Sequence, residues 1–165
     1  MGLHDQDFIH NGKKLINPID SHVGTLQLGS DVVTLTHLGL VYNKFNCDQH
    51  GLKLEDTNRK DRQNWASAQR ICQKRTRDCL AKLRMSKEVH QERTLGTELY
   101  LEVCSNYIDI FLSPRLNLRS RIVLASKVYF FSVFGNYGFN LEIIQLVGIH
   151  KTLLLLLILY RNNVF

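Results

Sequence analysis

The sequence has little of several features that would narrow its function quickly. It contains two prolines, one tryptophan and four cysteines in 165 residues, and none of the cysteines are two residues apart as in a zinc knuckle. No apolar run follows a basic patch at the N-terminus, so we expect no signal peptide. No Gly-x4-Gly-Lys-Ser/Thr loop is present, which argues against a P-loop nucleotide site. The small number of cysteines and their spacing exclude disulfide-dense and zinc-finger scaffolds.

The composition is that of a globular domain with a basic balance. Apolar residues make up 44% of the chain and charged residues 22%, and the formal net charge is +6. A positive excess favours anionic partners and does not predict a fold. We expect Cys47, Cys72, Cys79 and Cys104 to be reduced thiols, mostly in the core, in a nuclear or cytoplasmic protein.

Hydrophobic periodicity predicts a mainly α fold, a bundle of about four helices with an irregular N-terminal segment and a hydrophobic C-terminal tail. A short helix is expected at 9–15, ending before Pro18. A second helix should start at the Ser30-Asp31 cap and run to about residue 45, followed by a loop at 46–58. Later helices are expected at 59–87, between Thr94 or Thr97 and Ser113-Pro114, and at 119–134.

All four of the longer predicted helices have an apolar stripe in the sequence, and two of these stripes are specified in full. In the helix at 59–87 the stripe consists of Trp65, Ala68, Cys72, Cys79 and Leu83. In the helix that follows, the expected stripe is Leu99, Val103, Tyr107, Ile108 and Phe111.

The composition changes after residue 134. Residues 1–134 hold 33 of the 36 charged side chains, and only Glu142, Lys151 and Arg161 follow. The apolar run at 153–159 is shorter than the ~20 residues of a membrane span. We therefore expect no membrane span, and a tail that packs on the bundle or mediates self-association. The alternative is that the tail was never selected as protein sequence.

One N-terminal motif carries a resemblance to a known family. The run from Asp7 to Asn17 resembles the stretch around the second catalytic aspartate of P-element-like, RNase H-type DNA transposases. Asp7 takes the place of the aspartate, His10 that of the histidine, and Lys13, Leu15 and Asn17 those of the last anchors. Lys14 and Gly12 depart from the family pattern. The later sequence, including residues 63–69 and 121–125, looks like the helical insertion region of such proteins, so that the resemblance covers residues 5–134.

The resemblance implies a role for Asp7 as one of three carboxylates that hold two Mg²⁺ ions for phosphoryl transfer, with Asp5 as the competing assignment. The chain then divides into a remnant around the second Asp at 1–29, an insertion-like region at 30–134 and the tail at 135–165. Because one carboxylate is not an active site, we expect a truncated, transposon-derived protein, catalytically inactive, with no bound cofactor. Mg²⁺ is expected only in intact relatives, and GTP is suggested only by the resemblance.

A basic segment offers the one other functional signal. Residues 59–87 contain ten Lys or Arg against two Asp. Basic side chains on one helix face can bind nucleic-acid phosphates with salt-sensitive, sequence-independent affinity. The predicted contacts to DNA or RNA are Arg70, Lys74, Arg75, Arg77, Lys82 and Arg84. The alternative functions are a solvated surface helix or a small helical protein-interaction module with no nucleic-acid role. No specific small-molecule ligand is predicted.

Overall fold

The computed structural model describes residues 12–13, 16–20, 26–58, 64–86 and 93–134, and confirms that this part of the chain is mainly helical. The described ranges contain seven α-helices, one 3-10 helix and one two-stranded hairpin. In chain order the elements are η1 (Asn17–Asp20), β1 (Leu26–Leu28), β2 (Asp31–Val33), α2 (Leu35–Lys44), α3 (Cys47–His50), α4 (Leu54–Thr57), α5 (Trp65–Ile71), α6 (Lys74–Met85), α7 (Leu95–Leu112) and α8 (Leu118–Phe134). The expected helix at 9–15 is helical at 12–13 and otherwise lies outside the described residues.

The helix expected from Ser30-Asp31 begins later than predicted. Residues 31–33 form β2, which pairs antiparallel with β1 across a turn in which Gly29 has φ +61°. The hairpin prevails because Gly29 supplies the left-handed turn and Val32 and Val33 favour extended backbone. Helix α2 then begins after Thr34, whose hydroxyl accepts a hydrogen bond from the Thr36 amide at 3.2 Å.

The expected loop at 46–58 contains two four-residue helices. Asn46 precedes α3, and its amide donates to the Gln49 side chain at 3.1 Å. Gly51, with φ +67°, ends α3. The Lys53 amide donates to the Asp56 carboxylate at 2.8 Å at the start of α4. These polar residues, which suggested a loop, cap the ends of helices.

The expected continuous helix at 59–87 is wrong in one respect, because it breaks at Cys72 and Gln73. Cys72 ends α5, and Gln73 has an extended ψ of 147° before α6 begins. The Thr76 hydroxyl lies 3.1 Å from the carbonyl oxygens of both Arg70 and His50, which fixes this corner to the end of α3. The predicted stripe survives the break: Ala68, Cys72, Cys79 and Leu83 are buried, and Trp65 is half-buried.

Helix α7 ends before Ser113-Pro114 as predicted, but its buried stripe is shifted. Leu99 is 37% exposed, whereas Tyr100, Leu101, Cys104, Tyr107 and Ile110 are buried. The shift arises because α7 packs against α6 on one side and α8 on the other, so that its buried face is wider than one stripe. Helix α8 confirms the predicted helix at 119–134, and it buries Ala125 and Val128.

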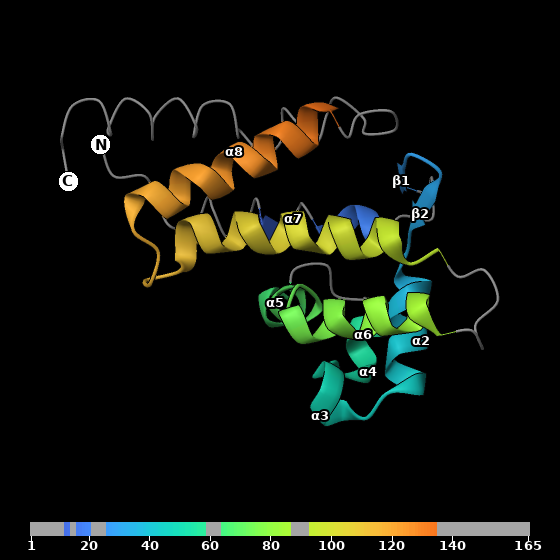
Figure 1. Ribbon diagram of the computed structural model, residues 1–165. Helices are drawn as coiled ribbons and strands as arrows, with labels where there is room; N and C mark the ends of the chain where they lie inside the picture. The colour runs from blue at the N-terminus through green and yellow to red at the C-terminus, as the bar shows by residue number, and fades with distance from the viewer. Residues whose placement is uncertain (1–11, 14–15, 21–25, 59–63, 87–92, 135–165) are drawn as a thin grey trace.

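Helix α7 lies in the middle of a layered arrangement, with α8 above it and α5, α6 and the shorter helices below it (Figure 1). The core runs through these layers and includes Ile16 and Ile19 from the N-terminal part as well as Val41, Leu80 and Leu101. No helix in the described ranges is long and apolar enough to cross a membrane. The tail at 135–165, with its predicted self-association, lies outside them.

Candidate nucleic-acid interface

The N-terminal motif is only partly described. Asp7 and His10 lie outside the described residues, Lys13 is half-buried, and Asn17 opens η1. Gly12, one of the two departures from the transposase pattern, packs against the ring of Trp65. A Cβ atom at Gly12 would lie 2.8 Å from a Trp65 ring carbon, which is closer than side chains tolerate. Glycine at this position therefore permits the contact between the motif and α5.

A metal centre is not formed by the part of the chain that the structure describes. None of its His, Cys, Asp or Glu side chains come together in groups of three that could hold an ion. No disulfide links the cysteines: Cys47 is exposed, while Cys72, Cys79 and Cys104 are buried, and all four are free thiols. Burial raises the pKa of the Cys79 and Cys104 thiols, which keeps both neutral and poorly nucleophilic.

Arg70 is not on an outward basic face. Its Nε and one terminal nitrogen donate to the two carboxylate oxygens of Asp56, at 2.8 Å each. The same terminal nitrogen donates to Glu55 at 2.6 Å. The Asp56 side chain is fully buried and that of Arg70 is 16% exposed. This bidentate pair joins α5 to α4 and uses the geometry that guanidinium and carboxylate groups prefer.

The pair also changes the acidity of Asp56. Burial by itself raises the pKa of this carboxyl group. Hydrogen bonds from Arg70 and from the Lys53 amide outweigh that effect, so the pKa of Asp56 lies below its ordinary value of 3.8. In turn, the hydrogen bond to Asp56 raises the pKa of Arg70. Arg70 is therefore a structural cation.

Three of the predicted cations form an exposed surface on α6, which we call the α6 face: Lys74, Arg75 and Lys82. Lys74, Asp78 and Lys82 are spaced by four residues and so lie on one side of the helix. Lys74 pairs with Asp78 at 3.3 Å, although both side chains are largely exposed, at 83% and 52%. The Arg75 Nε donates to the Gln73 side chain at 2.6 Å. Surface pairs of this kind exchange readily with water.

Arg77 and Arg84 flank this face on the side of α7. Arg77 is half-buried and lies near enough to Asp109 of α7 to affect its acidity. Burial raises the pKa of Asp109, and the positive charge of Arg77 opposes that shift. Arg84 approaches Glu98 of α7 at 3.4 Å and is 37% exposed. Both arginines lie beside acidic residues of α7 and can add only partly to an external contact.

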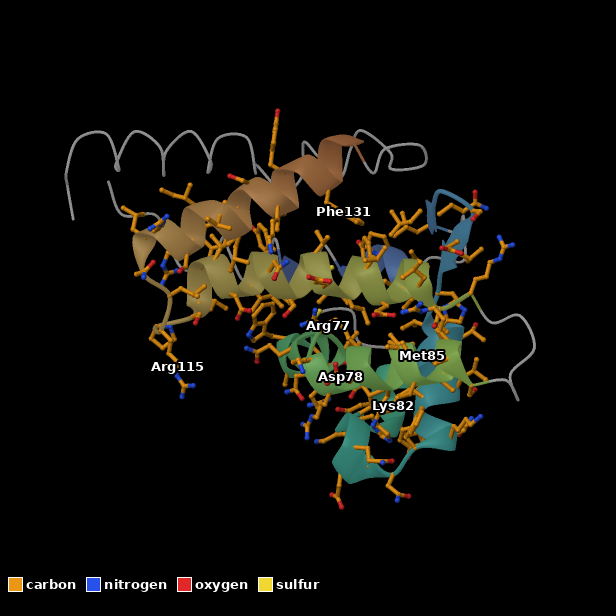
Figure 2. All side chains as sticks on the ribbon, in the orientation of Figure 1. Arg77, Asp78, Lys82, Met85, Arg115 and Phe131 are labelled. Atoms are coloured by element: carbon orange, nitrogen blue, oxygen red, sulfur yellow. The ribbon has the colours of Figure 1, made fainter. Side chains whose placement is uncertain are left out.

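The side chains of Asp78 and Lys82 project from α6, with Met85 at its C-terminal end and Arg77 toward α7 (Figure 2). From Lys74 to Met85 the helix carries five basic residues and one acid. Of the six predicted contacts, the structure thus brings three together in the open, places two at the boundary with α7 and removes Arg70. The other predicted basic residues, at 59–62 and 87, lie outside the described ranges.

Sequence reasoning missed a second group of exposed cations. Arg115, in the turn between α7 and α8 (Figure 2), and Arg119 and Lys127 of α8 are exposed. No Asp or Glu occurs from residue 110 to 134. The lack of acidic residues in this stretch indicates a basic surface. It was not predicted because the run of Lys and Arg at 59–87 is denser and α8 is largely apolar.

Searches of protein-family models, curated proteins and solved structures find no match to this chain.

Proposed function

We propose that this protein binds nucleic acid without sequence preference, through the α6 face. The observation that carries the proposal is the exposure of Lys74, Arg75 and Lys82 on one helix whose opposite side is buried. Thr76, Cys79, Leu80 and Leu83 fix that opposite side in the core. The helix therefore presents its cations outward without any change of fold.

Phosphate groups suit this surface better than base edges. Each Lys or Arg that reaches a phosphate releases condensed counterions, which gives affinity that falls with salt. The side chains of Lys74 and Lys82 are point charges on flexible stems, which favour phosphate contact over bidentate base reading. Asp78 lies between them and repels phosphate, so the affinity should be moderate.

Charge reversal on the α6 face tests the proposal. The double variant Lys74→Glu/Lys82→Glu should bind a short DNA duplex about tenfold more weakly than wild type at low salt, because two phosphate contacts are lost. Fluorescence anisotropy with a labelled duplex measures the affinity. Circular dichroism should show an unchanged helix signal, since both side chains are exposed.

A matched control separates the surface from net charge. Lys53→Glu/Arg93→Glu also changes two exposed cations, and takes the formal net charge from +6 to +2 as the α6 variant does. This control should keep wild-type affinity to within about twofold. Equal weakening of the two variants would show that overall charge, not the α6 face, governs binding, and unchanged binding in both would refute the proposal.

The resemblance at 7–17 further supports a transposon-derived origin, with no catalytic step assigned to the chain. The resemblance assigns only Asp7 as a metal ligand, and a single carboxylate cannot organise two Mg²⁺ ions. The purified protein should therefore show no Mg²⁺-dependent strand cleavage or joining on a labelled duplex. Cleavage that disappears in Asp7→Ala would overturn this part of the proposal.

A further inference from the structure

Helix α8 has an exposed stripe of its own, separate from the α6 face. Arg119, Val123 and Lys127 are spaced by four residues, so they lie on the same side of the helix, and all three are exposed. Val123 is 50% exposed. These three residues form what we call the α8 face, whereas Arg115 in the preceding turn lies on the α5 and α6 side of α7 (Figure 2). Ala125 and Val128 are buried on the other side.

The charge of the α8 face is not balanced within its own segment. The four basic residues between 110 and 134 meet no acid in that stretch. Of the four, Arg121 has a structural role, because its guanidinium donates hydrogen bonds to the carbonyl oxygens of Ile110, Ser113 and Leu116. Arg119 and Lys127 remain as the outward cations of the α8 face, which complement an anionic polymer.

The two basic faces belong to helices on opposite sides of α7. Helix α7 packs against both α6 and α8 and separates them (Figure 1). Helix α6 also packs against α2 and α3, and its cations are exposed on the part of its surface that these helices and α7 leave open. Helix α8 exposes Arg119 and Lys127 on the side opposite its buried Ala125 and Val128. The two faces therefore belong to helices that α7 separates, and we infer that one straight duplex does not contact both at once.

We propose that the α8 face is a second nucleic-acid contact, so that one chain holds two duplex segments, one on each side of α7. This inference rests on the proposed function of the α6 face. The α8 face has two outward cations and the α6 face has three, so the α8 face binds more weakly and dominates neither the affinity nor the salt dependence at low protein concentration.

A bridging assay tests the inference with the full chain. One duplex is fixed to beads, and a fluorescent duplex of different sequence is added with protein below the amount of either duplex. Wild type should retain the fluorescent duplex on the beads. Arg119→Glu/Lys127→Glu should lower retention at least tenfold, while its affinity for a single duplex, measured by anisotropy, changes less than twofold. Lys53→Glu/Arg93→Glu, which has the same net charge, should retain the duplex as wild type does.

The outcomes separate the two proposals. Full retention by Arg119→Glu/Lys127→Glu would overturn the inference, because bridging would then come from self-association of chains that each use the α6 face. Binding of a single duplex by wild type without retention of the second would also overturn it and leave the α6 proposal standing. No binding of a single duplex by wild type would refute the proposed function itself.

Discussion

Arg70 and Asp56 form a bidentate ion pair in which the carboxylate is fully buried, and this pair fixes α5 against α4. The sequence predicted that Arg70 lies on a basic surface, whereas in the structure Arg70 stabilises the contact between α5 and α4. The distinction matters for mutagenesis, because a loss of binding on changing Arg70 would report unfolding and not a lost phosphate contact.

Removal of the buried acid should be costly. Asp56→Ala leaves the guanidinium of Arg70 without its main partner, and we expect a loss of about 3 kcal/mol in unfolding free energy, at the low end for a broken buried pair because Arg70 keeps some exposure. Urea unfolding followed by circular dichroism measures it. Glu55→Ala removes the other carboxylate, which is 56% exposed, and should cost less than about 1 kcal/mol. Equal losses in the two variants would contradict the central role of Asp56.

The stability of the protein should depend on the ionisation of Asp56. Its pKa in the folded protein lies below 3.8, so its charged form stabilises the fold above that pH and the contribution is lost as pH falls through the lowered value. The stability difference between wild type and Asp56→Asn should therefore shrink as pH is lowered from about 5 toward 2. A difference that stays constant over this range would show that the Asp56 charge does not stabilise the fold.

Two glycines with positive φ allow a paired test of the end of α3. Gly29→Ala and Gly51→Ala should each cost about 1 kcal/mol, because both glycines have left-handed backbone, with φ of +61° and +67°. A Cβ atom at Gly29 meets no atom within 4 Å, whereas one at Gly51 would collide with the Arg75 guanidinium. Since the flexible Arg75 side chain can move aside, we expect the two variants to lose similar amounts of unfolding free energy. Duplex affinity should change only in Gly51→Ala, and an equal change in Gly29→Ala would contradict the assignment of Arg75 to the α6 face.

One buried hydroxyl joins the hairpin, α2 and α7. The Thr97 Oγ1 accepts a hydrogen bond from the Thr34 amide at 3.2 Å and lies 2.7 Å from His37 Nδ1. Thr97→Val keeps the shape but leaves these groups without that partner, so we expect a loss of about 2 kcal/mol. The exposed Thr36→Val should change stability by less than about 0.5 kcal/mol. Chemical denaturation of both variants checks the difference, and a tolerated Thr97→Val would show that the hydroxyl is dispensable.

Arg121 closes the C-terminal end of α7 with its guanidinium. It donates to the Ser113 carbonyl at 2.6 Å, to Leu116 at 3.1 Å and to Ile110. Arg121→Met should lower stability by about 2 kcal/mol, because these carbonyl groups lose a charged donor. The exposed Arg115→Met is the control, and thermal unfolding should hardly change in it. Similar melting temperatures for both variants would refute the capping role.

Periodicity predicted the helices that have one clear buried side. Helices α2, α6 and α8 lie within expected segments, and the stripe from Ala68 to Leu83 is buried as predicted. Periodicity did not predict the buried residues of α7, where Leu99 is partly exposed and Tyr100 is buried. Two layers cover that helix, so its buried face is wider than a single stripe. Hydrophobic alternation could not reveal the hairpin, since three-residue strands are too short to show it.

The basic segment was visible in the sequence, but the role of each cation depended on tertiary contacts. Arg70 and Lys74 are four residues apart and look equivalent on one helix. The break at Cys72 and Gln73 separates them, so that Arg70 turns to Asp56 while Lys74 stays exposed. Both Asp56 and Arg70 are ordinary surface residues by type, and only the fold identifies them as a pair.

The most direct test of the α6 face is the salt dependence of duplex binding by wild type and by Lys74→Glu/Lys82→Glu. The slope of log affinity against log salt concentration should be smaller in the variant by about 2, close to 0.9 for each of two lost phosphate contacts. Equal slopes and equal affinities for the two proteins would contradict the assignment of nucleic-acid binding to α6.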